Sequence, residues 1–162
     1  RRPEGLAAMR GILHLRAAVI AGRAGDRDQA DARLAEARAI ADATGELPDY
    51  GVTWGPVNVG VHAVAIAGEL EEYGQAIRLA ADVRIPRGWS RSRGGHHWMD
   101  LGRAYAWSGR EDEALDCLLK ARRAAPQQTR YHPTTRETVR ALKRRQRVRS
   151  AALAQYAEWV GV

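Results

Sequence analysis

The sequence predicts an all-α protein built as an α-solenoid, a right-handed superhelix of antiparallel helix pairs. Apolar residues recur every three or four positions through most of the 162 residues, as they do in helices that bury one face. Gly and Pro gather between these stretches, and no alternating strand pattern occurs. A spacing of small and apolar residues also recurs three times: Ala30, Leu34 and Ala37; Ala76, Ala80 and Val83; Ala114, Leu118 and Ala121.

The segment 98–126 carries the repeat most completely. It fits the tetratricopeptide pattern W-x2-L-G-x2-Y…A-x3-F…P, with Leu in place of the aromatic residue. The matching residues are Trp98, Leu101, Gly102, Tyr105, Ala114, Leu118, Ala121 and Pro126. The first four share one face of a helix, and Gly109 marks the turn to the next helix. The sequence therefore predicts a tetratricopeptide-like solenoid.

In chain order, we expect a single domain over residues 1–162, with three helix pairs followed by two terminal helices. The three repeats are predicted at about 4–44, 57–83 and 96–126. Loops at 45–56 and 84–95 separate the repeats, because Gly and Pro interrupt a helix. A basic helix is predicted at about 133–149, and a helix at about 150–160 caps the last apolar face, as solenoids require.

The formal charge of +7 comes from one segment. Residues 129–150 hold eight of the 26 Lys and Arg residues and only Glu137 as an acid, so the remainder is neutral. A clustered basic face could contact phosphates of nucleic acid. The alternative, which we prefer because reading of bases needs a defined groove geometry, is a solvated helix at the end of the array that at most touches phosphates. No aromatic residue interleaves the cations of the helix predicted at 133–149, so stacking on single-stranded bases is not expected.

Three segments, 54–62, 96–115 and 130–145, resemble the C-terminal tetratricopeptide region of actinobacterial helix-turn-helix regulators of the xenobiotic-response-element type. The most particular stretch is Gly-Pro-x-Asn-Val-x-x-His at 55–62. The resemblance implies a cytoplasmic transcriptional regulator whose repeats act as a sensor or assembly module. No helix-turn-helix precedes the repeats, so DNA would be bound only through an N-terminal domain missing from this chain.

The first helices of such repeats line a concave groove, which we expect to bind a peptide, a small molecule or a protein partner. The expected binding residues are Asn58, Val61, His62, His96, Met99, Arg103 and Arg130. Arg side chains at one end suit a ligand with an acidic group. An alternative interpretation of Asn58 and His62 is that they tie down the loop before their helix.

Catalysis, cofactors and metal sites are not expected. No nucleophile elbow, glycine-rich phosphate loop or H-E-x-x-H motif occurs, and His96 and His97 are adjacent rather than convergent. Cys117 is the sole cysteine and is expected to pack as a small residue. No membrane span is expected, because no run of about 18 apolar residues exists. The rival function is a scaffold for protein assembly or homodimerisation without a small ligand.

Overall fold

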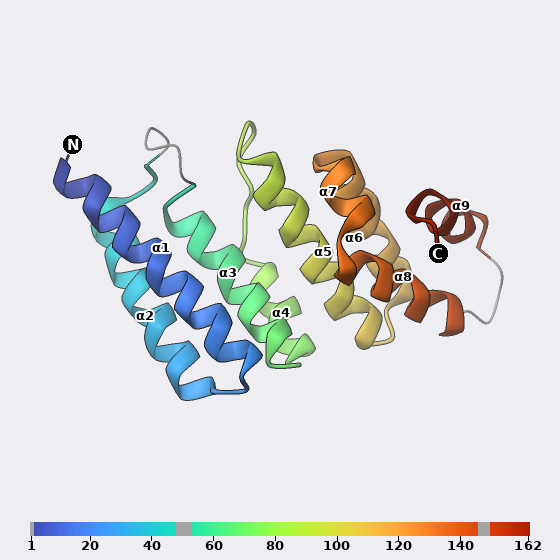
Figure 1. Ribbon diagram of the computed structural model, residues 1–162, viewed down its shortest axis with the longest axis horizontal. Coiled ribbons are helices and arrows are strands. Elements are labelled where there is room, and N and C mark those ends of the chain that lie inside the picture. Colours follow the sequence, from blue (N-terminus) through green and yellow to red (C-terminus); the bar gives the residue numbers. More distant parts are fainter. Residues whose placement is uncertain (1, 48–52, 146–149) are drawn as a thin grey trace. The chain divides into compact units, whose positions relative to one another are not determined.

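The computed structural model describes residues 2–47, 53–145 and 150–162 (Figure 1). Within these residues the chain is helical apart from turns and one isolated bridge, Leu47 with Trp54, so the all-α prediction is confirmed. The helices are α1 (Arg2–Arg23), α2 (Arg27–Thr44), α3 (Pro56–Glu69), α4 (Tyr73–Ala80), α5 (Arg91–Trp107), α6 (Glu111–Ala124), α7 (Pro126–Tyr131), α8 (Pro133–Arg145) and α9 (Ala151–Val160).

These helices form two compact units, residues 1–87 and 88–162. In the first unit, α1 packs along α2, and α3 packs on both of them and on α4. In the second unit, α5 packs along α6, and α7, α8 and α9 complete the unit. Neighbouring helices therefore pair in sequence order, which is the coarse feature of the predicted solenoid. The superhelical arrangement and the single domain stay predictions.

A buried tryptophan packs between helices of the first unit and joins α1 to α2. Trp54 is 1% exposed, and its indole nitrogen donates a hydrogen bond of 3.0 Å to the Thr44 hydroxyl at the end of α2. The far edge of its ring lies on Gly11 of α1, where an added Cβ would come within 1.9 Å of a ring carbon. The residue just ahead of α3 thus contacts both helices of the first pair, and only glycine fits beneath it.

The core of the second unit gathers around α6. Leu118 is fully buried there, with Leu142 of α8 and Tyr156 of α9 packed in the same cluster. The Tyr156 hydroxyl donates a hydrogen bond of 2.8 Å to the backbone carbonyl of Leu118. Because α9 buries its apolar side chains in this cluster, its exposed residues are mostly small or polar.

Two segments differ from the prediction. The loop expected at 84–95 ends earlier, because α5 already begins at Arg91 and contains Gly94 and Gly95. Gly95 is a contact residue and not a helix breaker, since a Cβ there would lie 2.8 Å from the Cβ of Ala125. The Ser90 hydroxyl accepts a hydrogen bond from the Arg93 N–H and caps the helix.

The second difference lies after α6, where the sequence predicted one basic helix at about 133–149. A short helix that was not predicted, α7, precedes it, and the described part of α8 runs from Pro133 to Arg145. Residues 146–149 of the predicted helix lie outside the described residues. Proline occupies the first position of both helices, where its missing N–H costs no hydrogen bond, so each proline starts a new helix.

Candidate functional site

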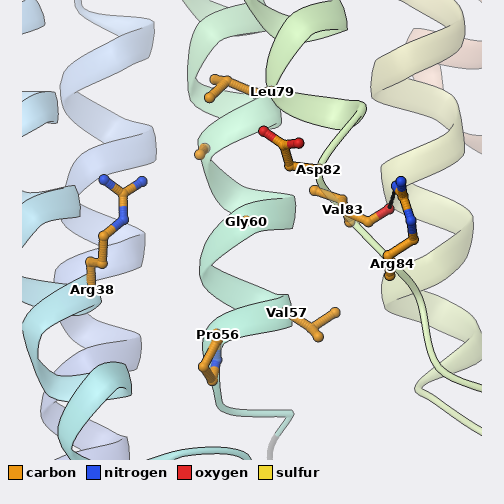
Figure 2. A pocket seen from close by; sticks show the side chains of 9 residues that line it. Arg38, Pro56, Val57, Gly60, Leu79, Asp82, Val83 and Arg84 are labelled. Atoms are coloured by element: carbon orange, nitrogen blue, oxygen red, sulfur yellow. Dashed lines mark hydrogen bonds between the residues drawn. The ribbon is translucent and has the colours of Figure 1, made fainter.

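A hollow of about 350 Å³ lies over α3 in the first unit (Figure 2). This volume is at the small end of the range for ligand sites, which is about 300–1,000 Å³. The hollow is lined by Arg38 from α2, by Pro56, Val57, Gly60 and Ala63 from α3, and by Leu79, Asp82, Val83 and Arg84 from α4 and the chain after it. Its position within one unit means that a single set of packed helices builds it.

Small residues on α3 leave the room for this hollow. Gly60 has no side chain, and a Cβ there would lie 3.2 Å from a methyl carbon of Val83. The chain after α4 turns back through a hydrogen bond from the Val83 N–H to the Ala80 carbonyl. That turn carries Asp82 and Val83 to one side of α3, while Arg38 stands on the other side (Figure 2).

The two arginines at the rim of the hollow differ in whether their guanidinium groups have hydrogen-bond partners. Among the described residues, Arg38 has no hydrogen-bond or ion-pair partner, and its side chain is exposed. The Arg84 guanidinium instead donates to the carbonyls of Ala81 and Val83. The free guanidinium at this rim therefore belongs to Arg38, opposite the single carboxylate of Asp82.

The N-terminus of α3 at the edge of the hollow is already capped. The Glu46 carboxylate accepts a hydrogen bond of 2.8 Å from the Val57 N–H. A carboxylate at a helix N-terminus also compensates the positive end of the helix dipole. A bound anion would therefore find its electrostatic partner at Arg38 and not at the helix end.

The predicted site residues of the first unit lie elsewhere on α3 and are buried. Asn58 is 1% exposed, and its amide nitrogen donates a hydrogen bond of 2.8 Å to the Thr53 carbonyl. The ring nitrogen Nδ1 of His62 lies 2.8 Å from the Asn58 carbonyl oxygen, and Val61 beside it is 4% exposed. The Asn58 contact is the one that the alternative interpretation expects, because it ties the helix to the preceding loop, whereas the His62 contact lies within α3 itself.

The predicted site residues of the second unit have mixed surroundings. Met99 is fully buried, whereas Arg103 is half-buried with its guanidinium 5.7 Å from the Trp107 ring centre. His96 is half-buried, and its Nδ1 lies 2.7 Å from the amide nitrogen of Gln128 on α7.

The remaining predicted residue, Arg130, is exposed and lies over the ring of Tyr131, with 5.6 Å between the guanidinium carbon and the ring centre. Of this set, the structure places His96 beside α7, through Gln128 and through a ring contact of 5.0 Å with His132. The groove expected to join the residues of both units stays a prediction.

Several cations of the basic helix are engaged with the ends of other helices. Arg136 donates to the carbonyl of Val160 at 3.0 Å, at the C-terminus of α9. Lys143 donates to the carbonyl of the final residue at 3.1 Å, and Arg145 donates to the Ala106 carbonyl at 2.6 Å, near the end of α5. The contact of Arg136 satisfies a carbonyl that α9 leaves unpaired at its end, and the contacts of Lys143 and Arg145 join α8 to Val162 and to the last turn of α5. They favour a structural role for these three cations over contact with nucleic acid.

The Cys117 thiol and the His97 imidazole could serve in catalysis, but burial holds both in unreactive protonation states. Cys117 is 3% exposed, and burial raises the pKa of its thiol to about 12, so the nucleophilic thiolate is scarce at neutral pH. His97 is 2% exposed, and burial lowers its pKa to about 4, which keeps its ring neutral. Across the described part of the chain, no three His, Cys, Asp or Glu side chains gather closely enough to hold a metal ion.

One helix in the described residues is long and apolar enough to cross a membrane, the segment Glu4–Arg23 of α1. The expectation of no membrane span considered only unbroken apolar runs and did not single out this segment, and it stays a prediction. The finding is weak evidence of a span, because core helices of soluble proteins pass the same test. In the structure α1 buries Ala8, Leu15 and Ala18 within the first unit.

Sequence reasoning missed the hollow. Its available signal was the pair Gly60 and Ala63, because small residues on one helix face leave space above it. The approach of Arg38 and Asp82 to that face depends on how α2 and the end of α4 pack. Comparisons with protein-family models, with curated proteins and with solved structures found no match.

Proposed function

We propose that this chain is a non-catalytic, tetratricopeptide-like sensor module of a cytoplasmic transcriptional regulator, and that it binds a small amphipathic anion. The observation that carries the proposal is the hollow over α3, with an apolar floor and the unpartnered guanidinium of Arg38 at its rim. The resemblance of residues 54–62, 96–115 and 130–145 to regulator repeats supports the sensor role. Contact with DNA would belong to a separate domain.

The ligand chemistry follows from the two sides of the hollow. Pro56, Val57 and Val83 offer apolar surface to a short hydrocarbon chain. Arg38 presents several N–H donors in a plane and can bind both oxygens of a carboxylate. Asp82 on the opposite rim repels a second negative charge. A monocarboxylate with one alkyl chain therefore fits better than a dianion.

A ligand in this position touches two helix pairs of the first unit at once. Its head group contacts α2 through Arg38, and its chain contacts α3 and the segment after α4. Occupancy would favour one angle between the pairs over others, because the ligand binds best where both sides reach it. We propose this change of angle as the signal passed to an attached domain.

Calorimetric titration with octanoate tests the proposal. Octanoate should bind the protein, whereas octanol lacks the charge and acetate lacks the chain, so both should bind much more weakly. Arg38→Gln should weaken octanoate binding about fivefold to tenfold, as expected for one charged hydrogen-bond contact at an exposed rim. Asp82→Asn should strengthen it, because a negative charge near the ligand is removed.

Arg33→Gln is the matched control, because Arg33 is also exposed on α2 but does not line the hollow. Equal binding of octanoate by the wild type and by Arg38→Gln would overturn the site, and so would equal binding of octanol and octanoate. No binding of any of the three compounds would overturn the proposed ligand class.

A scaffold without a small ligand is the second candidate function. A specific observation favours it: α1 exposes several large apolar side chains, which is typical of a surface that contacts another protein. The two functions can coexist, because the hollow is not lined by α1.

A further inference from the structure

The outer face of α1 carries a stripe of exposed apolar side chains. Leu6, Met9, Leu13 and Ile20 are 74%, 50%, 64% and 67% exposed. Their separations of three, four and seven residues place them on one side of the helix. The opposite side holds fully buried residues such as Leu15. The helix is therefore apolar on two faces, and within the described chain only one of them is covered.

We propose that this stripe is a two-fold interface with a second copy of the same chain, an inference that goes beyond the proposed ligand site. The half-buried Ala17 completes the stripe between Leu13 and Ile20. The positions 6, 9, 13, 17 and 20 then have the same spacing read from either end, with Leu13 at the centre. An isologous dimer needs this property, because the same patch must match itself when reversed.

An antiparallel pair of α1 helices would satisfy every position of the stripe. Leu13 would meet the partner's Leu13 at the two-fold axis, and Leu6 would meet the partner's Ile20. Met9, the longest of the four exposed side chains, would lie over the partner's Ala17, which is the smallest member of the stripe. Large side chains facing small ones allow the helices to interdigitate.

The size of the stripe is near what a dimer requires. Leu6 and Ile20 lie about 21 Å apart along the helix at about 1.5 Å per residue. The four exposed side chains offer on the order of 450 Å² per copy, or about 900 Å² in a pair, and a specific interface needs roughly 1,000 Å². The apolar stems of Arg10 and Arg16 flank the stripe and would contribute the remainder.

The charges at the flanks are compatible with this pairing. At 100° per residue, Arg10 and Arg16 lie about 60° to either side of the stripe. In the reversed pair, each would lie beside the partner's Ala17 or Met9 and not beside the opposing cation. Arg10 also has Glu36 within 3.8 Å on its own chain. A membrane surface or an unrelated helix would have no need of the reversal symmetry, which is why we favour a second copy.

Sedimentation of the full chain over a range of concentrations tests the proposal. The wild type should form a dimer, and Leu13→Arg should weaken it at least tenfold, because two cations would meet at the axis. Leu13 is largely exposed in the monomer, so circular dichroism should show the helices intact. Tyr131→Arg is the matched control, since Tyr131 is 65% exposed on α7 in the second unit.

Cysteine cross-linking tests the register. Leu13→Cys should form a disulfide-linked dimer under mild oxidation, because the two positions meet at the axis. Leu6→Cys alone should not cross-link, but an equal mixture with Ile20→Cys should. Cys117 is buried and should not interfere.

A monomer at all concentrations would overturn the proposal, as would a dimer that tolerates Leu13→Arg. Cross-linking of Leu6→Cys to itself would overturn the antiparallel register. Sedimentation with anionic lipid vesicles, lost in Leu13→Arg, would assign the stripe to a membrane surface instead. Octanoate binding by Leu13→Arg should be unchanged, so failure of this interface and failure of the ligand site can be distinguished.

Discussion

The two units treat side chains of similar character in opposite ways. The first unit leaves Leu6 and Leu13 of α1 largely exposed, at 74% and 64%. Among the described residues of the second unit, the large hydrophobic side chain left exposed is Tyr131, while leucines such as Leu118 are buried. The difference teaches that the spacing of apolar residues in the sequence indicates how many apolar faces a helix has. It does not indicate how many of those faces are buried by the other helices of the same unit.

The number of apolar faces explains the contrast. α9 has one apolar face, which the cluster around Leu118 covers, and its C-terminal carbonyls accept hydrogen bonds from Arg136. α1 has two apolar faces, and one layer of helices covers only the face that includes Leu15. A helix of the second kind is therefore stable in its unit and still offers a surface for association.

The largest expected effect comes from truncating one leucine in each unit, one buried and one exposed. Leu118→Ala should lower the free energy of unfolding by about 3 kcal/mol, because it removes fully buried methyl groups and leaves a cavity. Leu13→Ala should change it by less than about 0.5 kcal/mol in the monomer, since this side chain is exposed. Urea denaturation at low protein concentration measures both, and a large loss in Leu13→Ala would show that its face is covered.

Acid should destabilise the second unit through His97. Burial lowers its folded-state pKa from 6.5 to about 4, so the unfolded chain binds a proton that the folded chain excludes. The free energy of unfolding is therefore unaffected by His97 above pH 6.5. It falls as the pH decreases from 6.5 to about 4, for a total loss of about 3 kcal/mol. Denaturation at several pH values should show this slope, and His97→Gln should flatten it. An unchanged slope in the variant would place the titrating group elsewhere.

A smaller difference in stability is expected between variants of two arginines on α8. Arg136→Gln should cost about 1 kcal/mol of stability, because the carbonyls at the end of α9 lose a charged donor. Arg140→Gln should cost almost nothing, since Arg140 is exposed on the same helix. Thermal unfolding of the two variants checks the difference. If both lose the same stability, the hydrogen bonds to Val160 do not stabilise the folded chain.

Much of the helical architecture could be predicted from the sequence, because apolar period and chain breakers are local signals. The turn at Gly109 and the helices on either side of it lie where the repeat pattern places them. Gly95 shows the limit of such signals. Its role depends on Ala125, which lies far along the chain and approaches it only after folding.

The candidate site was less predictable for the same reason. Asn58 and His62 were expected at a binding surface, but both are buried, with Asn58 bonded to the preceding loop and His62 in contact with a carbonyl of its own helix. The hollow instead depends on Arg38 and Asp82, which belong to different helix pairs. No pattern in either pair indicates that their side chains stand on opposite sides of Gly60.

The contact between Gly11 and Trp54 has an evolutionary consequence. A glycine inside a helix costs about 1 kcal/mol of stability relative to alanine. Glycine at position 11 is therefore favoured only while the indole ring of Trp54 lies on it and leaves no room for a Cβ. Any larger residue there requires a smaller one in place of the tryptophan, so the tryptophan must change before the glycine or together with it. Related chains that keep the tryptophan should therefore also keep the glycine, which gives a paired signature by which distant relatives can be recognised.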